Sequence, residues 1–314
     1  MRTVRFHEYG EPGDVLQLEN APVPDPGAGL IRIAVHAAGL APADWALCRG
    51  LFAGSLPRGI GCDVSGTVDA VGEGVTGVVV GDVVFGTADW ANSASAGASD
   101  YAVMNRWFPV PEGLDLLQAA AMPMTIDSAY GHLHRLGLEA GKTIVINGAG
   151  TTIGFAAVQI ALHRGMNVIA TTGETYAQDL RDRGAKVTAY GEGLVERVAE
   201  LADAPVDLAF DTAPVGGALP DLVRIVGGDP KRVMTNSDFA AAMELGVRAT
   251  FTEDMTDRVE ALPEFARLAA EGRFRIPIAA TFPLDRWKDA LELSLGNNAR
   301  GKLLLLPRTG DTND

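Results

Sequence analysis

The residues with the clearest chemical potential form a glycine turn. Residues 143–147 are predicted to be an apolar strand, and Gly148 and Gly150 follow it directly. A turn between a strand and a helix directs backbone N–H groups and the amino terminus of the helix at one point, where phosphate binds. Glycine permits the tight turn and lets a ligand approach the backbone closely. The segment therefore predicts a site for the pyrophosphate of a dinucleotide.

The first turn of the following helix supplies the other predicted contacts. Thr151 and Thr152 can cap the helix and donate hydroxyl hydrogen bonds to phosphate, and Ile153 follows them. Gly154 lets the helix pack closely on the strand. Three residues separate Gly150 from Gly154, whereas the strict dinucleotide-binding fingerprint Gly-x-Gly-x-x-Gly has two at this place. A turn that only connects strand to helix is the alternative, and the agreement of strand, turn and helix disfavours it.

The end of the second strand of this region bears on the choice of cofactor. A site for NAD usually has Asp or Glu there to bind the ribose 2′-hydroxyl. Here the strand ends in Thr172, which leaves room for a 2′-phosphate and favours NADPH, although Glu174 follows closely. Arg181, Arg183 and Lys186 are nearby basic candidates for that phosphate, or residues of a solvated helix face.

The first part of the chain is predicted to be β structure. Apolar and polar residues alternate in 3–9, 30–36 and 64–71, and glycine and proline separate these runs. No helical pattern alternates with them, which favours an antiparallel, partly open barrel. The small residues of 92–99 are predicted to form a mobile loop.

The middle of the chain has a different pattern. Strands are predicted at 143–147, 167–172, 186–189, 206–211, 232–235 and 247–251, with amphipathic helices between them. This alternation is typical of βαβ units and of a doubly wound parallel sheet of the Rossmann type.

The last part of the chain returns to isolated strands. A strand at 278–282, a helix at 284–295 and a strand at 302–306 are predicted, and the last strand is expected to rejoin the first domain. The sequence thus predicts an α/β protein in which a Rossmann domain, residues 119–275, is inserted into a barrel domain of residues 1–118 and 276–314.

Length and charge narrow the class of function. The 314 residues suffice for about two domains, and the formal net charge is −14. This charge repels phosphate backbones and anionic lipid, so we expect a small-molecule substrate and binding to neither nucleic acid nor membrane. With only Cys48 and Cys62 as cysteines and no long apolar run, the chain is expected to be cytoplasmic.

Several segments together resemble the zinc-free quinone oxidoreductase branch of the medium-chain dehydrogenase/reductase superfamily. Besides the glycine turn, they are 39–45, which resembles an Asn-Pro-x-Asp-Trp segment, and 61–68, 71–75, 81–84, 281–284 and 301–303. The resemblance covers essentially the whole chain. It implies a GroES-like catalytic domain, a Rossmann domain that binds NADPH, and a homodimer.

The resemblance also assigns cofactor residues. It implies that Tyr190 lies by the adenosine phosphate, and that Thr125 and Asn236 lie near the nicotinamide. Two positions depart from the family pattern. Tyr176 stands where a lysine often binds the 2′-phosphate, and Ala41 replaces an asparagine that contacts nicotinamide and substrate.

Zinc enzymes of the superfamily have other residues at two further places. They carry a cysteine where Ala41 stands and a His-Glu pair where Cys62 and Asp63 stand. Cys62 alone does not supply the three protein ligands of a catalytic zinc, and it is otherwise a small buried residue. No cysteine follows Asp63, so the four-cysteine structural zinc lobe is also missing. No metal site is predicted, which favours hydride transfer to an electrophilic carbon over alcohol oxidation.

The substrate side is less well defined. Trp45, Phe52 and Trp90 could wall an apolar pocket or fill the core, and Asp44 is interpreted as a cap or turn anchor. No side chain stands out as a general acid. The predicted function is an NADPH-dependent reductase of quinones or α,β-unsaturated carbonyls. A biosynthetic enoyl or ketone reductase and a non-catalytic NADPH-binding protein are the alternatives.

Overall fold

The computed structural model describes residues 1–250, 260–296 and 299–308. The chain divides into two compact units. We call residues 1–124 with 262–314 the barrel unit and residues 125–261 the Rossmann unit. None of the helices within the described residues has the length and apolar character needed to cross a membrane.

The Rossmann unit is built on a six-stranded sheet in the order β10-β9-β8-β11-β12-β13. Every neighbouring pair in it is parallel. The strands are β8 (Thr143–Asn147), β9 (Asn167–Thr171), β10 (Lys186–Thr188), β11 (Leu208–Asp211), β12 (Val233–Thr235) and β13 (Arg248–Ala249). This is the doubly wound order that the sequence predicts. The predicted strand at 247–251 is shorter in the structure, and its last residue lies outside the described residues.

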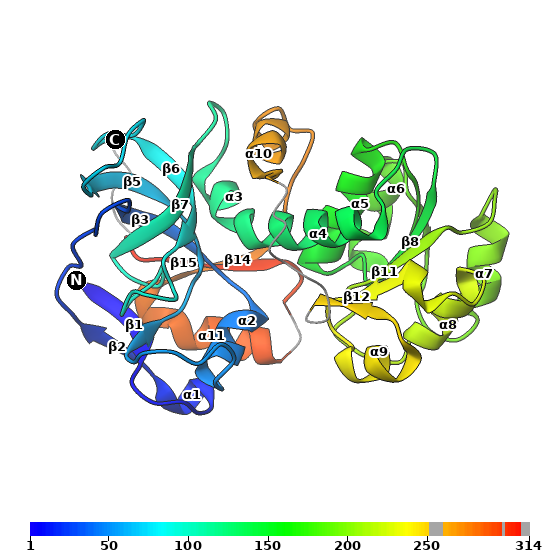
Figure 1. Cartoon of the computed structure of the whole chain (residues 1–314), viewed down its shortest axis with the longest axis horizontal. Helices are drawn as coiled ribbons and strands as arrows, with labels where there is room; N and C mark the ends of the chain where they lie inside the picture. Colours follow the sequence, from blue (N-terminus) through cyan, green and yellow to red (C-terminus); the bar gives the residue numbers. More distant parts are fainter. Residues whose placement is uncertain (251–259, 297–298, 309–314) are drawn as a thin grey trace. The chain divides into compact units, whose positions relative to one another are not determined.

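Helices cover this sheet on both faces because its strands are apolar on both sides (Figure 1). The helices are α4 (Pro123–Leu136), α5 (Thr152–His163), α6 (Glu174–Asp182), α7 (Leu194–Leu201), α8 (Leu219–Ile225) and α9 (Phe239–Leu245), with a 3₁₀ turn, η1 (Pro230–Arg232). On one face, α7, α8 and α9 share a core with Val145 and Ala209. On the other face, the ring of Phe210 stacks on His132 of α4 with 5.2 Å between centroids.

The barrel unit contains two sheets. The larger has the order β14-β15-β3-β5-β6-β7, with β7 also pairing to β3, so that β3, β5, β6 and β7 close on themselves. Its strands are β3 (Ile31–Leu40), β5 (Asp63–Val71), β6 (Val83–Ala88), β7 (Tyr101–Pro109), β14 (Ile278–Pro283) and β15 (Lys302–Leu306). The smaller consists of β1 (Arg2–Phe6), β2 (Leu16–Asn20) and β4 (Arg58–Gly59).

Short helices surround this barrel. They are α1 (Pro12–Val15), α2 (Pro42–Cys48), α3 (Leu116–Ala121), α10 (Leu262–Ala270), the 3₁₀ turn η3 (Leu284–Arg286) and α11 (Trp287–Leu295). The last strand, β15, pairs antiparallel with β3. The prediction that the last strand rejoins the first domain is therefore confirmed.

The units divide at 124/125 and 261/262, whereas the sequence suggests 118/119 and 275/276. A long-range contact explains part of the difference. The side-chain amide of Gln118 donates to the carbonyl of Ile276 and accepts from its N–H, both at 2.9 Å. These bonds tie both connecting segments to the barrel unit.

Candidate functional site

The glycine turn after β8 needs glycine at three positions for three different reasons. Gly148 has φ +75°, and a Cβ there would lie 2.6 Å from the backbone nitrogen of Ala213. A Cβ on Gly150 would lie 2.8 Å from Oγ1 of Thr172. A Cβ on Gly154 would lie 2.4 Å from the carbonyl oxygen of Gly148, so this glycine sets the close packing of α5 on the turn.

The amino terminus of α5 leaves donors for an anion. Thr151 is the N-cap, and its Oγ1 accepts from the N–H of Gly154 at 3.0 Å and shares a 3.0 Å hydrogen bond with Thr212. Its hydroxyl is thus used within the protein. Among the described residues, the N–H groups of Thr152 and Ile153 meet no acceptor, as is usual in a first helical turn. These N–H groups fit a pyrophosphate.

A buried polar network that the sequence analysis missed lies under the turn. Asn147 donates to Asp211 at 2.8 Å and accepts from Thr171 at 2.6 Å, and Thr235 donates to Asp211 at 2.8 Å. These residues end β8, β11, β9 and β12, so the network crosses four neighbouring strands. Burial raises the pKa of Asp211, and its hydrogen bonds from Asn147 and Thr235 oppose that shift. A polar residue at the end of each apolar run was the signal available in the sequence.

The end of β9 carries the predicted hydroxyls in two different roles. Thr171 is fully buried in the polar network, so Thr172 is the hydroxyl beside Gly150. Tyr190 lies in the same region: it is 66% exposed, and a Cβ on Gly173 would lie 4.0 Å from its ring. The residue after Thr172 is a glycine, so no carboxylate occupies the strand end itself.

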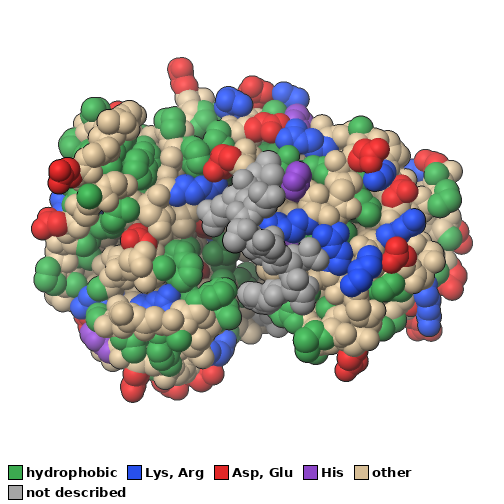
Figure 2. All heavy atoms as spheres, viewed as in Figure 1, with side chains coloured by type: hydrophobic (Ala, Val, Ile, Leu, Met, Phe, Trp, Pro, Cys, Tyr) green, Lys and Arg blue, Asp and Glu red, His purple; other side chains and the backbone are tan. Residues whose placement is uncertain are grey.

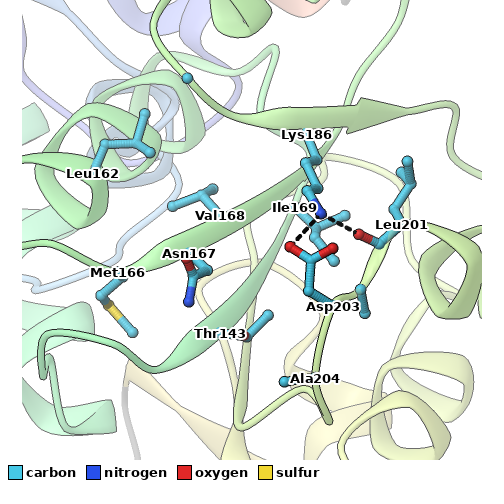
Figure 3. Close-up of a pocket in the computed structure, with 12 residues that line it drawn as sticks. Thr143, Leu162, Met166, Asn167, Val168, Ile169, Lys186, Leu201, Asp203 and Ala204 are labelled. Atoms are coloured by element: carbon cyan, nitrogen blue, oxygen red, sulfur yellow. Dashed lines mark hydrogen bonds and ion pairs between the residues drawn. The ribbon is translucent and has the colours of Figure 1, made fainter.

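The predicted basic partners lie at the other edge of the sheet. Lys186 is the first residue of β10, and its ammonium donates to Asp203 and to the carbonyl of Leu201, both at 2.7 Å. It lines a cavity with Thr143 and Asn167, the first residues of their strands (Figure 3). Because all strands are parallel, this cavity marks the amino-terminal edge, opposite the glycine turn.

The two arginine candidates lie at the same edge of the sheet as Lys186. Arg181 and Arg183 lie at the carboxyl end of α6, which leads back to the beginning of β10. Arg183 donates to Asp179 and to Gln159, both at 2.8 Å. These positions do not support Arg181, Arg183 or Lys186 as the partner of a 2′-phosphate at the end of β9, which leaves the alternative of a structural or solvated role for the three.

The two residues assigned to the nicotinamide side lie in the Rossmann unit. Asn236 follows β12 directly, and its N–H donates to the carbonyl of Asp211 at 3.2 Å. It thus lies at the same edge of the sheet as the glycine turn. Thr125 is buried in the first turn of α4. Their contacts with a cofactor stay predictions.

In the barrel unit, Asp44 anchors two segments of backbone. Its carboxylate accepts from the N–H of Ala41 at 2.8 Å and from the N–H of Gly61 at 2.7 Å. The side chain is fully buried, and this burial raises the pKa of Asp44 to about 6 despite both hydrogen bonds. The interpretation of Asp44 as a cap is confirmed.

Next to Asp44 lies a buried ion pair. The ammonium of Lys302 donates to Asp63 at 2.7 Å, and the two side chains are 4% and 1% exposed. The other oxygen of Asp63 accepts from the N–H of Met124 at 2.9 Å. The thiol of Cys62 lies 3.8 Å from the carboxylate of Asp44, and burial raises the pKa of this thiol well above its usual range.

The three predicted aromatic residues separate into two groups. Trp45 is 2% exposed in the core, where its indole N–H donates to Ser294 at 2.8 Å. Phe52 is 57% exposed, and its ring lies 6.2 Å from that of Trp90. The buried guanidinium of Arg58 lies 5.5 Å from the Trp90 ring and donates to the Phe52 carbonyl at 2.6 Å. Phe52 and Trp90 therefore form one aromatic surface, and Trp45 is part of the core.

The chain is similar to known proteins over its whole length. Residues 27–114 match the family described as alcohol dehydrogenase GroES-like domain, and residues 145–305 match the family described as zinc-binding dehydrogenase. Quinone oxidoreductase of Homo sapiens is 29% identical, and the alignment covers 98% of each chain.

Two further comparisons bear on the site. A 2-methylene-furan-3-one reductase of Solanum lycopersicum is 33% identical over 188 residues, 56% of this chain and 48% of that one. The structure of the quinone oxidoreductase from Coxiella burnetii superposes with a TM-score of 0.80 at 26% identity, and the match covers 98% of this chain and 99% of that one.

Proposed function

This chain belongs to the zinc-binding dehydrogenase family of the medium-chain dehydrogenase/reductase superfamily, and from that premise we propose that it is an NADPH-dependent reductase of quinones or α,β-unsaturated carbonyls that needs no zinc. Membership of the family makes the chain a nicotinamide-dependent oxidoreductase. The observation that supports the preference for NADPH is the glycine turn beside a strand end without a carboxylate. Two relatives of the chain, named quinone oxidoreductase and 2-methylene-furan-3-one reductase, support the same class of substrate.

The Rossmann unit would bind the cofactor through its backbone. The N–H groups of Thr152 and Ile153 and the amino terminus of α5 would hold the pyrophosphate. Thr172 would face the adenosine ribose, and Asn236 would lie toward the nicotinamide. When bound, the reduced nicotinamide supplies a hydride to an electrophilic carbon. The protein contributes orientation of the two reactants, which is worth roughly 7–11 kcal/mol in favourable cases.

The donor set supports the zinc-free part of the proposal. A catalytic zinc needs three protein ligands, and Ala41 has no donor atom. The carboxylate of Asp63 already binds Lys302 and the N–H of Met124. Cys62 is held as a neutral thiol by burial, with Asp44 beside it. Within the described residues, no group of three His, Cys, Asp or Glu side chains converges as a metal site would. These residues do not fit zinc.

The proton that completes the reduction is proposed to come from water. The pKa of Asp44, about 6, would suit a proton donor, but the side chain is fully buried and both its oxygens accept backbone hydrogen bonds. Its role is thus to hold the backbone at Ala41 and Gly61. The barrel unit would offer the substrate the aromatic surface of Phe52 and Trp90, which suits a flat, conjugated acceptor.

The test is a comparison of electron acceptors after removal of metal ions. The protein, dialysed against EDTA, would be mixed with NADPH and one of three acceptors: 1,4-benzoquinone, a simple enone or a saturated ketone. In a separate assay it would be mixed with NADP⁺ and an alcohol. We expect turnover with the quinone or the enone, unchanged by EDTA, and none with the ketone or the alcohol. EDTA-sensitive alcohol oxidation would contradict the proposal. Binding of NADPH without turnover on any acceptor would favour the non-catalytic alternative.

A further inference from the structure

The basic side chains of the Rossmann unit are distributed unevenly along its strands. Lys and Arg side chains are common on the surface of this unit (Figure 2), so their position matters more than their number. All but one of those in its described residues lie at the beginning of a strand or the end of a helix: Arg135, Lys142, Arg164, Arg181, Arg183, Lys186, Arg224, Lys231, Arg232 and Arg248. Because the helices run opposite to the parallel strands, both places belong to the amino-terminal edge. The exception is Arg197.

Arg197 lies at the edge where the glycine turn is found. It is the fourth residue of α7, and its side chain reaches back to the loop that follows β10. Its Nε donates to Oγ1 of Thr188 at 3.1 Å, and the guanidinium also donates to the carbonyls of Ala189 at 3.0 Å and Glu192 at 2.5 Å. Longer contacts reach the carbonyls of Tyr190 at 3.4 Å and Gly191 at 3.3 Å.

The same contacts bring Arg197 close to the end of β9. Thr188 pairs with Thr171 in the sheet, and the carbonyl of Thr188 accepts from the N–H of Thr172 at 3.1 Å. Only one strand therefore separates the guanidinium from Thr172. Tyr190, on the loop that Arg197 holds, lies beside Gly173. The arginine is thus next to the strand end that determines which ribose substituent a dinucleotide site accepts.

The charge of Arg197 has no counter-ion in the described part of the chain. No carboxylate there forms an ion pair with it, in contrast to Arg183 and Lys186 at the other edge. Its hydrogen bonds go to a hydroxyl and to carbonyls, which carry only partial charge. Nη1 donates one bond, to Glu192, and a guanidinium nitrogen of that kind has two N–H groups. One N–H of Nη1 is therefore available to an anion.

We infer that Arg197 recognises the 2′-phosphate of NADPH, with the hydroxyl of Thr172 as its neighbour. The inference rests on the proposed function, because it names the residue that would give that reductase its preference for NADPH. A phosphate group on the ribose carries about two negative charges, and arginine is suited to bind it. Without a cation at this edge, a strand end that lacks a carboxylate would only tolerate the 2′-phosphate and would not select it.

The experiment measures binding of two nucleotides that differ only in the 2′-phosphate. Adenosine 2′,5′-bisphosphate and 5′-AMP would be titrated into the wild-type protein by calorimetry, so no turnover is needed. The variants are Arg197→Met and Arg197→Lys, with Arg224→Met as the control because Arg224 lies at the end of α8 and is exposed. We expect the wild type to prefer the bisphosphate by about tenfold or more, since a hydrogen bond to a charged group is worth about that factor.

Arg197→Met is expected to lose most of this preference while its affinity for 5′-AMP stays within about twofold of the wild type. Arg197→Lys should keep part of the preference, and Arg224→Met all of it. Equal weakening of both nucleotides in Arg197→Met would assign the residue to holding its loop and would overturn the inference. A preference that survives in Arg197→Met would overturn it too, with the proposed use of NADPH left standing.

A wild type without any preference would instead remove the NADPH part of the proposed function and the inference with it. Thermal unfolding of each variant checks that the fold is retained. If Arg197→Met is unstable, Arg197→Gln carries the test, because glutamine removes the charge and keeps a donor for the loop carbonyls. Its expected result is the same loss of preference.

Discussion

The two units each bury a polar cluster, and the clusters differ in whether hydrogen-bond donors beside them are left without a protein partner. In the Rossmann unit, Asn147, Thr171, Asp211 and Thr235 join four strand ends and support a turn whose outer N–H groups stay free. In the barrel unit, Asp44 and Asp63 are satisfied by backbone N–H groups and by Lys302. The first cluster thus positions a ligand site, whereas the second completes the fold. Burial of polar groups alone does not identify a site; donors without protein partners do.

The largest expected effect tests the barrel cluster. Lys302→Met would leave the carboxylate of Asp63 buried without its cation, and breaking such a pair costs about 3–5 kcal/mol. Urea unfolding would measure the loss. Lys186→Met is the matched control, because the Lys186–Asp203 pair has side-chain exposures of 42% and 89% and should contribute less than about 1 kcal/mol. Equal losses in the two variants would contradict the distinction between them.

The next effect is a dependence of stability on pH that comes from Asp44. Burial raises the pKa of Asp44 in the folded protein to about 6, above its ordinary value of 3.8, so between these two pH values the folded state holds a proton that the unfolded state releases. The contribution is present below about pH 4 and is lost as pH rises through about 6, by roughly 3 kcal/mol. Unfolding of the wild type and of Asp44→Asn would be compared between pH 4 and 7. The unfolding free energy of the wild type should fall relative to that of Asp44→Asn as pH rises from 4 to 7, and a difference between the two that does not change with pH would contradict this account.

A smaller effect is expected in the Rossmann cluster. Asp211→Asn keeps the shape but cannot accept hydrogen bonds at both positions, so one of the donors from Asn147 and Thr235 loses its partner. This costs about 1–3 kcal/mol of unfolding free energy, and because the network supports the glycine turn, NADPH binding should also weaken. Urea unfolding and calorimetric titration would measure the two changes. Normal NADPH affinity in a destabilised variant would contradict the claim that the network supports the ligand site.

The smallest effect on stability is expected at Tyr190. Its ring is 66% exposed, so Tyr190→Ala should change the unfolding free energy by less than about 0.5 kcal/mol. If the ring lies against the adenosine of the cofactor, the same change should weaken NADPH binding several-fold, as loss of a stacking contact does. An unchanged affinity would remove Tyr190 from the site.

Much of the fold could be predicted from the sequence because local patterns were strong. The strands at 143–147 and 302–306 have the predicted bounds. The segment 92–99 is a loop as predicted, but Ser95–Ser99 is buried, which does not favour the predicted mobility of that part. A Cβ on Gly59 would lie 2.3 Å from the nitrogen of Ala96, so small residues here signal close packing between distant segments. Such packing is a tertiary property that no local pattern reveals.

The site was predictable to the extent that it depends on one segment. The glycine turn and the end of β9 are local, and the structure has them at the expected places. Arg197 and the pair of Asp63 with Lys302 depend on which edge of a sheet, or which distant strand, a residue reaches. The basic residues nearest to Thr172 in sequence lie at the wrong edge, because a helix carries them back along the sheet. Sequence distance was therefore a poor guide to the partner of a 2′-phosphate.

The most direct test of the central claim is the oxidation of NADPH by 1,4-benzoquinone in EDTA-dialysed wild type and in Gly150→Val. The added side chain would fill the space between the turn and Thr172, where even a Cβ lies 2.8 Å from Oγ1. We predict metal-independent turnover in the wild type and at least a tenfold lower kcat/KM in a variant that unfolds at nearly the same temperature. Unchanged kcat/KM in Gly150→Val, or turnover in the wild type that EDTA abolishes, would contradict the account.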